Sequence, residues 1–233
     1  MPGLHFYSGG LLRMAHESAD RAEKLAATTK DGLVDETLVT VVLAASAAEG
    51  FINDMVGFIR FLADIPGLKA DAAIMRLAEI ANALDSLEED KAQIRSKYLI
   101  AALLLRCNQI SAGSEPLQSY SKVVALRNSI VHAKPVSPDD DDKIVKLVTS
   151  LAQSGLCRNI QKIPNSMNSE TWWVVMRTPS VAWWAVQSAN ALMLALVQSM
   201  VAIGDSEGLI SKFRDSLQSS LVDARKRSGR LQP

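Results

Sequence analysis

The sequence predicts an all-helical bundle, and three observations support this fold class. Its 233 residues are 48% hydrophobic but only 5% aromatic, with alanine, leucine and valine predominant, which favours packed helices over a sandwich of strands. Segments of helical periodicity are separated by proline, glycine and capping residues, which are typical of helix ends. The length fits a single domain, residues 1–233, with a substantial hydrophobic core.

The expected helices follow from these breaks. The first is separated from the second at Asp31-Gly32, and the second ends at Ile65-Pro66-Gly67, where proline and glycine disfavour helix. Ser114-Glu115-Pro116 and Thr178-Pro179-Ser180 each place a capping residue before a proline in the first turn. The resulting segments, which include one long central apolar helix, are residues 11–29, 34–63, 70–87, 88–110, 114–134, 137–155, 178–202 and 207–223.

Three regions need a separate interpretation. Periodicity fails at residues 156–177, which we interpret as an irregular insertion in which residues 172–176 are compatible with a short strand. Residues 205–233 hold the last, more polar helix and a basic tail at residues 225–230, expected to be solvated. The acidic run at residues 139–142 follows a helix start and indicates a solvated first turn rather than a metal site, because four consecutive helical residues point in different directions.

Charge and cysteine content restrict the classes of function. Lysine plus arginine and aspartate plus glutamate each total 25, so the formal net charge is zero and bulk attraction to nucleic acid is not predicted. Cys107 and Cys157 form neither a disulfide framework nor a metal-ligand cluster, which makes a reducing cytoplasm the simplest compartment. No secretory signal is expected, and polar residues within the apolar segment 181–203 favour a buried core helix over a membrane span.

The most informative segment is an R-N-x-x-x-H motif late in the helix expected at residues 114–134. Turning successive residues by about 100° places Arg127 within a wide apolar arc, whereas Asn128 and His132 lie together at its edge. We expect this arc to be buried, and it consists of Leu117, Tyr120, Val123, Val124, Leu126, Ile130 and Val131. Arg127 and His132 diverge by about 140°, so they serve one site only if the arginine swings across or the helix end distorts. A guanidinium and an imidazole together could hold a phosphodiester and move its protons.

A guanidinium on an apolar face is costly unless it is paired or opens into a polar cleft. Arg127 is therefore either an internal clamp, bound to a carboxylate of a neighbouring helix, or a phosphate ligand that faces a cavity or a partner subunit. The second expected helix offers a partner, because Glu49, Asn53 and Arg60 fall within roughly one 40° strip. Glu49 could hold Arg127, orient His132 or simply pair with Arg60.

The segment from Arg127 to His132 resembles the R-x4-6-H signature of HEPN domains, a superfamily of helical nucleotide-binding and ribonuclease domains. A polar residue commonly follows the arginine in that family, as Asn128 does here, and the alanine-rich residues 46–53 are similar to its earlier core helix. The resemblance covers roughly residues 33–202, apart from the insertion at residues 156–177. It implies a helical bundle that forms a homodimer in which two motifs face each other.

The resemblance implies a metal-independent, cofactor-free endoribonuclease of a prokaryotic defence or toxin system, with a small nucleotidyltransferase as candidate antitoxin. His132 would move protons of the ribose 2′-hydroxyl or the leaving oxygen, and Arg127 would stabilise charge on the phosphoryl oxygens. Asn128 would fix the histidine or donate to phosphate, with Glu49 and Asn53 as auxiliary polar residues. RNA would be the substrate and DNA inert, because DNA lacks the 2′-hydroxyl.

The alternative is a non-catalytic HEPN-like module for dimerisation and for binding a protein or nucleotide, since other members of the family have lost catalysis. The zero net charge and the acidic run at residues 139–142 disfavour a long phosphate chain, so an RNA substrate would be short or positioned by a partner. The enzyme hypothesis predicts RNA cleavage in EDTA that depends on His132. The module hypothesis predicts no cleavage and a mainly structural role for Arg127.

Overall fold

The computed structural model describes residues 6–68, 71–132, 138–158, 169–201 and 208–215, and this part of the chain is helical and contains no strand. The fold class that the sequence predicts is therefore confirmed. Residues 159–168 of the insertion, residues 216–223 of the expected last helix and the basic tail at residues 225–230 lie outside the described residues. The described helices are α1 (Tyr7–Ala26), α2 (Glu36–Asp64), α3 (Ala72–Glu89), α4 (Ile94–Leu104), α5 (Glu115–Val131), α6 (Pro138–Gln153), α7 (Ser169–Met176), α8 (Pro179–Val201) and a short segment at residues 209–215.

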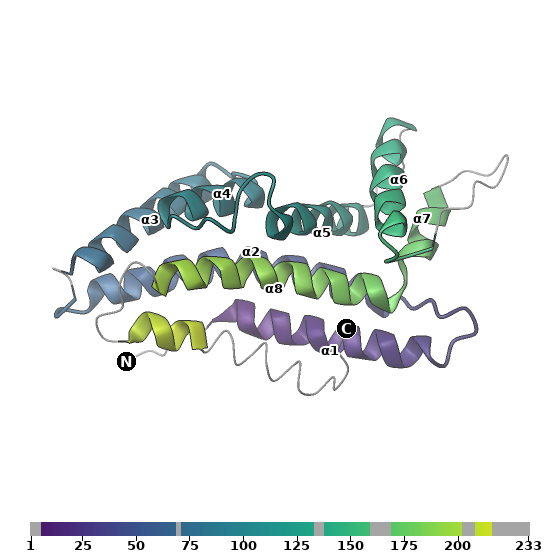
Figure 1. Ribbon diagram of the computed structural model, residues 1–233, viewed down its shortest axis with the longest axis horizontal. Helices are drawn as coiled ribbons and strands as arrows, with labels where there is room; N and C mark the ends of the chain where they lie inside the picture. Colours follow the sequence, from purple (N-terminus) through teal and green to yellow (C-terminus); the bar gives the residue numbers. More distant parts are fainter. Residues whose placement is uncertain (1–5, 69–70, 133–137, 159–168, 202–207, 216–233) are drawn as a thin grey trace.

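The two longest helices, α2 and α8, form the centre of the bundle (Figure 1). Helix α1 packs against both on one side, and α3, α4 and α5 follow one another along the opposite side. Helices α6 and α7 contact each other at one end of the bundle, beyond the last turn of α5. Helix α5 thus presents one side to the central helices and directs its C-terminal end toward α6.

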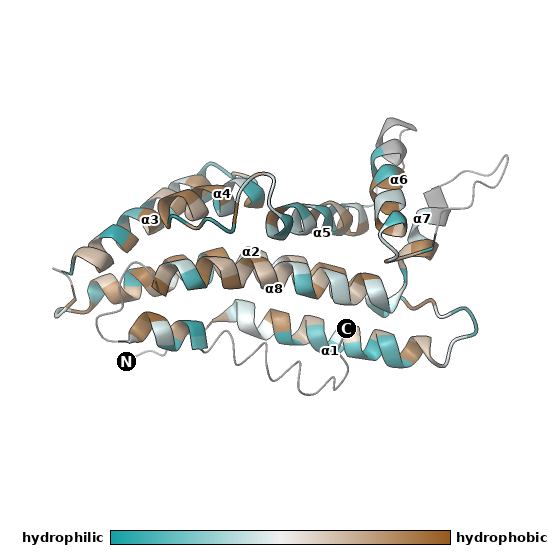
Figure 2. Ribbon diagram, in the orientation of Figure 1, coloured by the Kyte–Doolittle hydropathy of each residue, from teal (hydrophilic) through white to brown (hydrophobic). Residues whose placement is uncertain are grey.

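Small side chains allow the neighbours of α2 to approach its backbone closely. Ala44, Ala45, Ala47 and Ala48 are all fully buried, and the apolar residues of α2 and α8 lie along the middle of the bundle in Figure 2. Alanine is also the best helix former, so this run keeps the helix intact while it makes room for packing. The close approach matters for the site, because two tyrosine hydroxyls reach backbone carbonyls of α2 in this run.

Helices α2 and α8 are both long and apolar enough to cross a membrane, judged by length and composition alone. Within their most apolar 18-residue windows, however, 56% and 61% of the residues are buried inside the bundle, and core helices of soluble proteins pass the same test. Polar groups inside α8 are partly satisfied within the helix, since the buried Ser188 hydroxyl donates to the Trp184 carbonyl at 2.8 Å. The expected core helix at residues 181–203 is found as α8.

The short strand expected at residues 172–176 is wrong, because these residues belong to α7. An alternating strand would place Trp172, Val174 and Met176 on one face. Instead Trp172, Val175 and Met176 are buried, while Val174 is 42% exposed. This i, i+3, i+4 pattern is that of a helix packed on one side, and α7 packs on α6.

Three other helix ends differ from expectation. Helix α4 ends at Leu104 and not at residue 110, and Arg106 just after it lies in the left-handed region (φ 55°). The third and fourth expected helices do not meet at residue 88, because α3 continues to Glu89 and α4 begins only at Ile94, with Lys91 in the left-handed region (φ 53°) between them. Ser114 does precede α5, but its hydroxyl accepts from the backbone N–H of Ser111 at 2.9 Å and makes no capping bond to α5. The N-terminus of α5 therefore follows the expected position without the expected cap.

Candidate functional site

Helix α5 carries the R-N-x-x-x-H motif and packs on α2 and α8 through its apolar side. The predicted buried arc is confirmed at its centre, where four side chains are at most 1% exposed: Leu117, Tyr120, Val123 and Leu126. It is wrong at its end, where Val131 is 53% exposed, so the neighbouring helices do not cover the last turn of α5 on that side. Arg127 lies between these extremes, with 21% of its side chain exposed.

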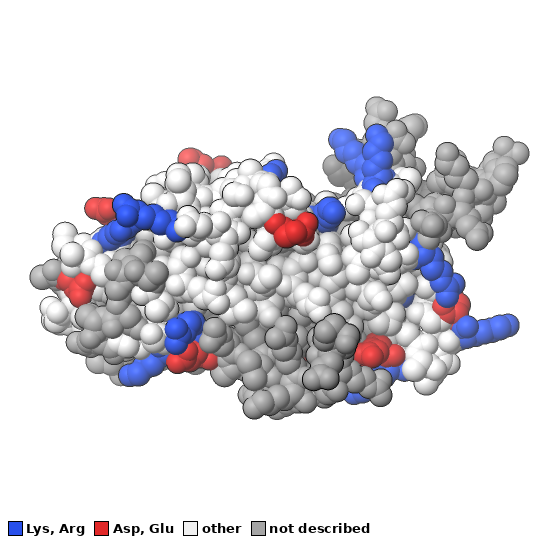
Figure 3. Space-filling view, in the orientation of Figure 1, with Lys and Arg blue, Asp and Glu red and all other residues white. Residues whose placement is uncertain are grey.

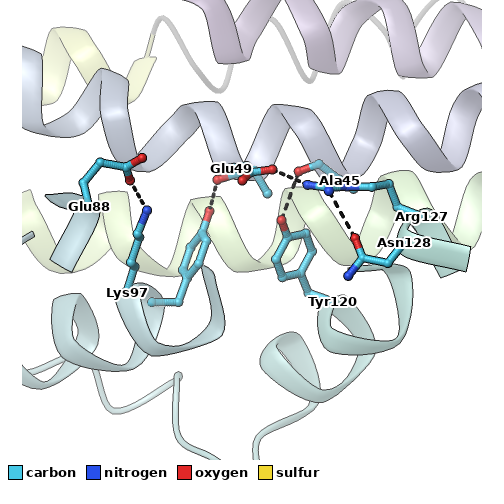
Figure 4. A network of polar contacts seen from close by, with 9 residues as sticks. Ala45, Glu49, Glu88, Lys97, Tyr120, Arg127 and Asn128 are labelled. Carbon is cyan, nitrogen blue, oxygen red and sulfur yellow. Dashed lines mark hydrogen bonds and ion pairs between the residues drawn. The ribbon is translucent and has the colours of Figure 1, made fainter. Parts of the chain in front are cut away.

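Arg127 points toward α2 and forms an ion pair with Glu49 (Figure 4). Its Nη1 donates to Asn128 Oδ1 at 3.1 Å. Its Nε is buried and has no hydrogen-bond partner. Of the partners that the sequence left open for Glu49, the structure selects Arg127. The guanidinium is thus bound between α5 and α2, as the clamp interpretation requires, while a fifth of the side chain still reaches the surface.

His132 lies at the C-terminal end of the motif, just after α5. It is the residue after the last turn of α5, with φ −109° and ψ 40°, and its backbone N–H donates to the Asn128 carbonyl at 2.9 Å. Its side chain is exposed and makes no direct hydrogen bond to Arg127. Within one chain, therefore, no hydrogen bond links the imidazole to the guanidinium, whose partners are Glu49 and Asn128.

Two buried tyrosines support the turn of α2 that bears Glu49. Tyr120 of α5 donates to the Ala45 carbonyl at 3.0 Å, and Tyr98 of α4 donates to the Ala48 carbonyl at 2.8 Å. Burial raises the pKa of both hydroxyls, and the nearby Glu49 carboxylate raises the pKa of Tyr120 further. Sequence analysis did not assign these contacts, although a tyrosine on a buried helical face requires a partner for its hydroxyl.

A second ion pair lies beside the first. Lys97 of α4 binds Glu88 of α3, and only 8% of the lysine side chain is exposed against 56% of the glutamate side chain (Figure 4). Burial of a cation next to a more exposed carboxylate is also the arrangement at Arg127 and Glu49, whose side chains are 21% and 47% exposed. Sequence analysis missed this pair, because its two residues lie on different helices and have no shared motif.

The polar strip predicted on α2 does not act as one unit. Glu49 binds Arg127 of α5, whereas Arg60 binds Asp85 of α3. Asn53, expected as an auxiliary residue, is exposed and makes no side-chain hydrogen bond to the other described residues. The strip therefore divides between two neighbouring helices. Among the described residues, the side chains of Asn53 and His132 are the expected site groups that form no hydrogen bond with Glu49, Arg127 or Asn128.

Charge around the site is mixed. On the face shown in Figure 3, basic and acidic side chains lie close to one another and much of the described surface is uncharged. No group of three or more His, Cys, Asp and Glu side chains among the described residues could hold a metal ion. Any chemistry argued from this part of the chain therefore rests on Arg127, Asn128, His132 and their partners.

No family model, no curated protein and no solved structure matches this chain. The chain offers a guanidinium held at an interhelical contact, an amide beside it and an exposed imidazole five residues further on. Such groups are suited to binding phosphate and transferring protons near neutral pH, provided that guanidinium and imidazole meet.

Proposed function

We propose that the chain is a metal-independent endoribonuclease of HEPN type that works as a cytoplasmic homodimer. The observation that carries this proposal is the exposed position of His132 at the end of α5, five residues after an arginine that is itself partly open to the surface. An exposed imidazole can both accept and release a proton near neutral pH.

A homodimer would bring an Arg127 and a His132 together, although the two side chains of one chain point in different directions. Because Arg127 faces α2 and His132 lies beyond the helix end, one chain alone does not bring them together. A two-fold contact near the last turn of α5 would place His132 of one subunit beside Arg127 of the other. Val131, which is apolar and 53% exposed next to His132, is suited to such a contact.

The chemistry follows from these roles. His132 would take the proton of the ribose 2′-hydroxyl, whose oxygen would attack the adjacent phosphorus and release the 5′-oxygen of the next nucleotide. That oxygen would take up a proton from water, and His132 would return its own proton to the solvent. The products would be a 2′,3′-cyclic phosphate and a 5′-hydroxyl. Arg127 would offset the charge that builds on the non-bridging oxygens, and Asn128 would donate to phosphate. A role in defence or as a toxin, restrained by a nucleotidyltransferase-type antitoxin, is part of the same proposal.

The decisive experiment is incubation of the purified chain with single-stranded RNA in EDTA. We expect cleavage by the wild-type protein, none of DNA of the same sequence and none of RNA by His132→Ala. Gln118→Ala is the matched control, because Gln118 is an exposed residue of the same helix that lies outside the motif and outside the proposed dimer contact. Absence of cleavage by the wild-type dimer, or undiminished cleavage by His132→Ala with a helical circular dichroism spectrum, would contradict the proposal.

A second candidate is a non-catalytic helical module for dimerisation and for binding a protein or nucleotide. The ion pair between Arg127 and Glu49 favours it, because the guanidinium is already neutralised by a carboxylate of the same chain. The zero net charge agrees with this reading. It predicts that RNA stays intact and that Arg127→Ala lowers the melting temperature or dimer affinity, as measured by differential scanning calorimetry and analytical ultracentrifugation.

A further inference from the structure

We propose that Glu49 is a built-in competitor for phosphate: its carboxylate occupies Arg127 in the free protein and must leave before a phosphate group can bind. The inference rests on the proposed function, in which Arg127 is the phosphate ligand. It adds a regulatory contact to that site, and it is carried by the pairing and the unequal exposure of two residues.

In the folded chain, both terminal nitrogens of the Arg127 guanidinium already donate hydrogen bonds. Arg127 donates through Nη2 to Glu49 and through Nη1 to Asn128, and its Nε is buried without a hydrogen-bond partner. Phosphate binds guanidinium best through two parallel N–H bonds. In the structure shown in Figure 4, Glu49 and Asn128 each engage one Nη of Arg127 and Nε is buried, so both terminal nitrogens already hold a partner.

The two side chains of the ion pair differ in how far they are exposed to solvent. The Arg127 side chain is 21% exposed and lies between α5 and α2, whereas the Glu49 side chain is 47% exposed. A half-exposed carboxylate regains its hydration when it rotates away, while the largely buried guanidinium would lose the one charged partner that it has among the described residues. Glu49 is therefore the group that moves, and an incoming phosphate supplies the replacement charge.

The α2 backbone next to Glu49 and the Asn128 amide stay in place when the carboxylate moves. The Tyr98 and Tyr120 hydroxyls hold the α2 backbone in the turn that leads into Glu49, through the Ala48 and Ala45 carbonyls. Departure of the carboxylate is therefore a side-chain rotation that leaves the helix where it is. The Asn128 amide turns its oxygen toward Arg127 and its nitrogen away (Figure 4). Its NH₂ group is available to donate to an anion that arrives from the exposed side.

Removal of the carboxylate charge should therefore strengthen anion binding. Glu49→Gln keeps an oxygen acceptor for Arg127 but removes the competing charge. A partly exposed ion pair is worth about 1 kcal/mol, which converts to roughly fivefold in a dissociation constant. Asp85→Asn is the matched control, because Asp85 is also the carboxylate of an ion pair between α2 and a neighbouring helix, with Arg60.

The test is a titration of the full-length chain with inorganic phosphate, at constant ionic strength held with chloride, followed by thermal unfolding. A ligand that binds the folded state raises the melting temperature as its concentration exceeds the dissociation constant. We expect Glu49→Gln to respond at about a fifth of the phosphate concentration that the wild type requires. Asp85→Asn should match the wild type, and Glu49→Gln/Arg127→Gln should lose the response.

A response of Glu49→Gln equal to that of the wild type, or one that survives in Glu49→Gln/Arg127→Gln, would overturn the proposal. A measurement on the wild type covers the case of a variant that does not fold: saturating phosphate should move the side-chain carboxyl ¹³C resonance of Glu49 to the position of a solvated glutamate. An unmoved resonance at saturation would refute the exchange. Neither readout uses RNA cleavage, so a failure of the proposed ribonuclease activity is seen separately in the EDTA assay.

Discussion

Arg127 and Glu49, which lie 78 residues apart in the sequence, form an ion pair that joins α5 to α2. The pair lies at the boundary between the core and the surface. The Arg127 side chain is largely buried, whereas about half of the Glu49 side chain is exposed to water. The same contact therefore contributes to the stability of the bundle and sets the electrostatic state of the only motif that indicated a function.

The first prediction concerns the strength of this pair. A double-mutant cycle with Arg127→Ala and Glu49→Ala should give a coupling energy of about 1–2 kcal/mol, because the largely buried guanidinium is shielded from water. The same cycle on Arg60 and Asp85, whose arginine side chain is 60% exposed, should give about 0.2–1 kcal/mol. Urea unfolding measures both, and a larger coupling for the Arg60–Asp85 pair would contradict the prediction.

The second prediction concerns the tyrosine hydroxyls. Tyr98→Phe and Tyr120→Phe should each lower the free energy of unfolding by about 1 kcal/mol, since each removes one buried hydrogen bond to a carbonyl of α2 and leaves the ring packing unchanged. Tyr7→Phe is the control, because Tyr7 is 73% exposed. Chemical denaturation of the three variants decides it, and equal effects at all three positions would count against a structural role for the buried hydroxyls.

The third prediction is an alkaline loss of stability from the same residues. Burial raises the pKa of Tyr98 and Tyr120, so the folded state holds their protons more tightly than the unfolded chain does. The free energy of unfolding should therefore fall as pH rises above about 10, where tyrosines of the unfolded chain ionise. In Tyr98→Phe/Tyr120→Phe this slope should be shallower, as followed by denaturation midpoints between pH 9 and pH 11. An unchanged slope would show that other groups cause the loss.

The fourth prediction compares two ways of removing the Lys97–Glu88 pair. Glu88→Gln leaves an ammonium whose side chain is only 8% exposed without its countercharge, and should cost about 1–2 kcal/mol. Lys97→Met removes that charge and keeps an apolar stem of similar length, so its stability should be close to wild type. Glu88→Gln should cause little further loss in the Lys97→Met background, and thermal unfolding would show it. A Lys97→Met variant that is less stable than Glu88→Gln would contradict this prediction.

Most of the helical order was predictable because it depends on local chemistry. Proline, glycine and capping residues mark the ends of α2, α5 and α8 near the expected positions. The prediction was wrong at α7, where consecutive apolar residues suit either a strand or a helix and only packing on α6 decides between them. It was also wrong for Val131, because a wheel gives direction around the helix axis and not how far the neighbours extend.

The candidate site was predictable in its parts and not in its connections. The wheel placed Arg127 on the apolar side of its helix and separated it from His132, and both features are found in the folded chain. The choice of partner for Glu49, the tyrosine bonds to α2 and the Lys97–Glu88 pair were not predictable, because each joins residues on different helices.

The sequence by itself determined that the chain is helical, where most helices begin and end, and that one arginine lies on an apolar side, because periodicity and backbone chemistry act over a few residues. Only the tertiary structure decided that Glu49 binds Arg127, that Asn53 does not join them and that His132 is left exposed. Those outcomes depend on which helices contact each other and on how they are aligned along their axes. Both are set by the packing of whole helix faces against α2 and α8.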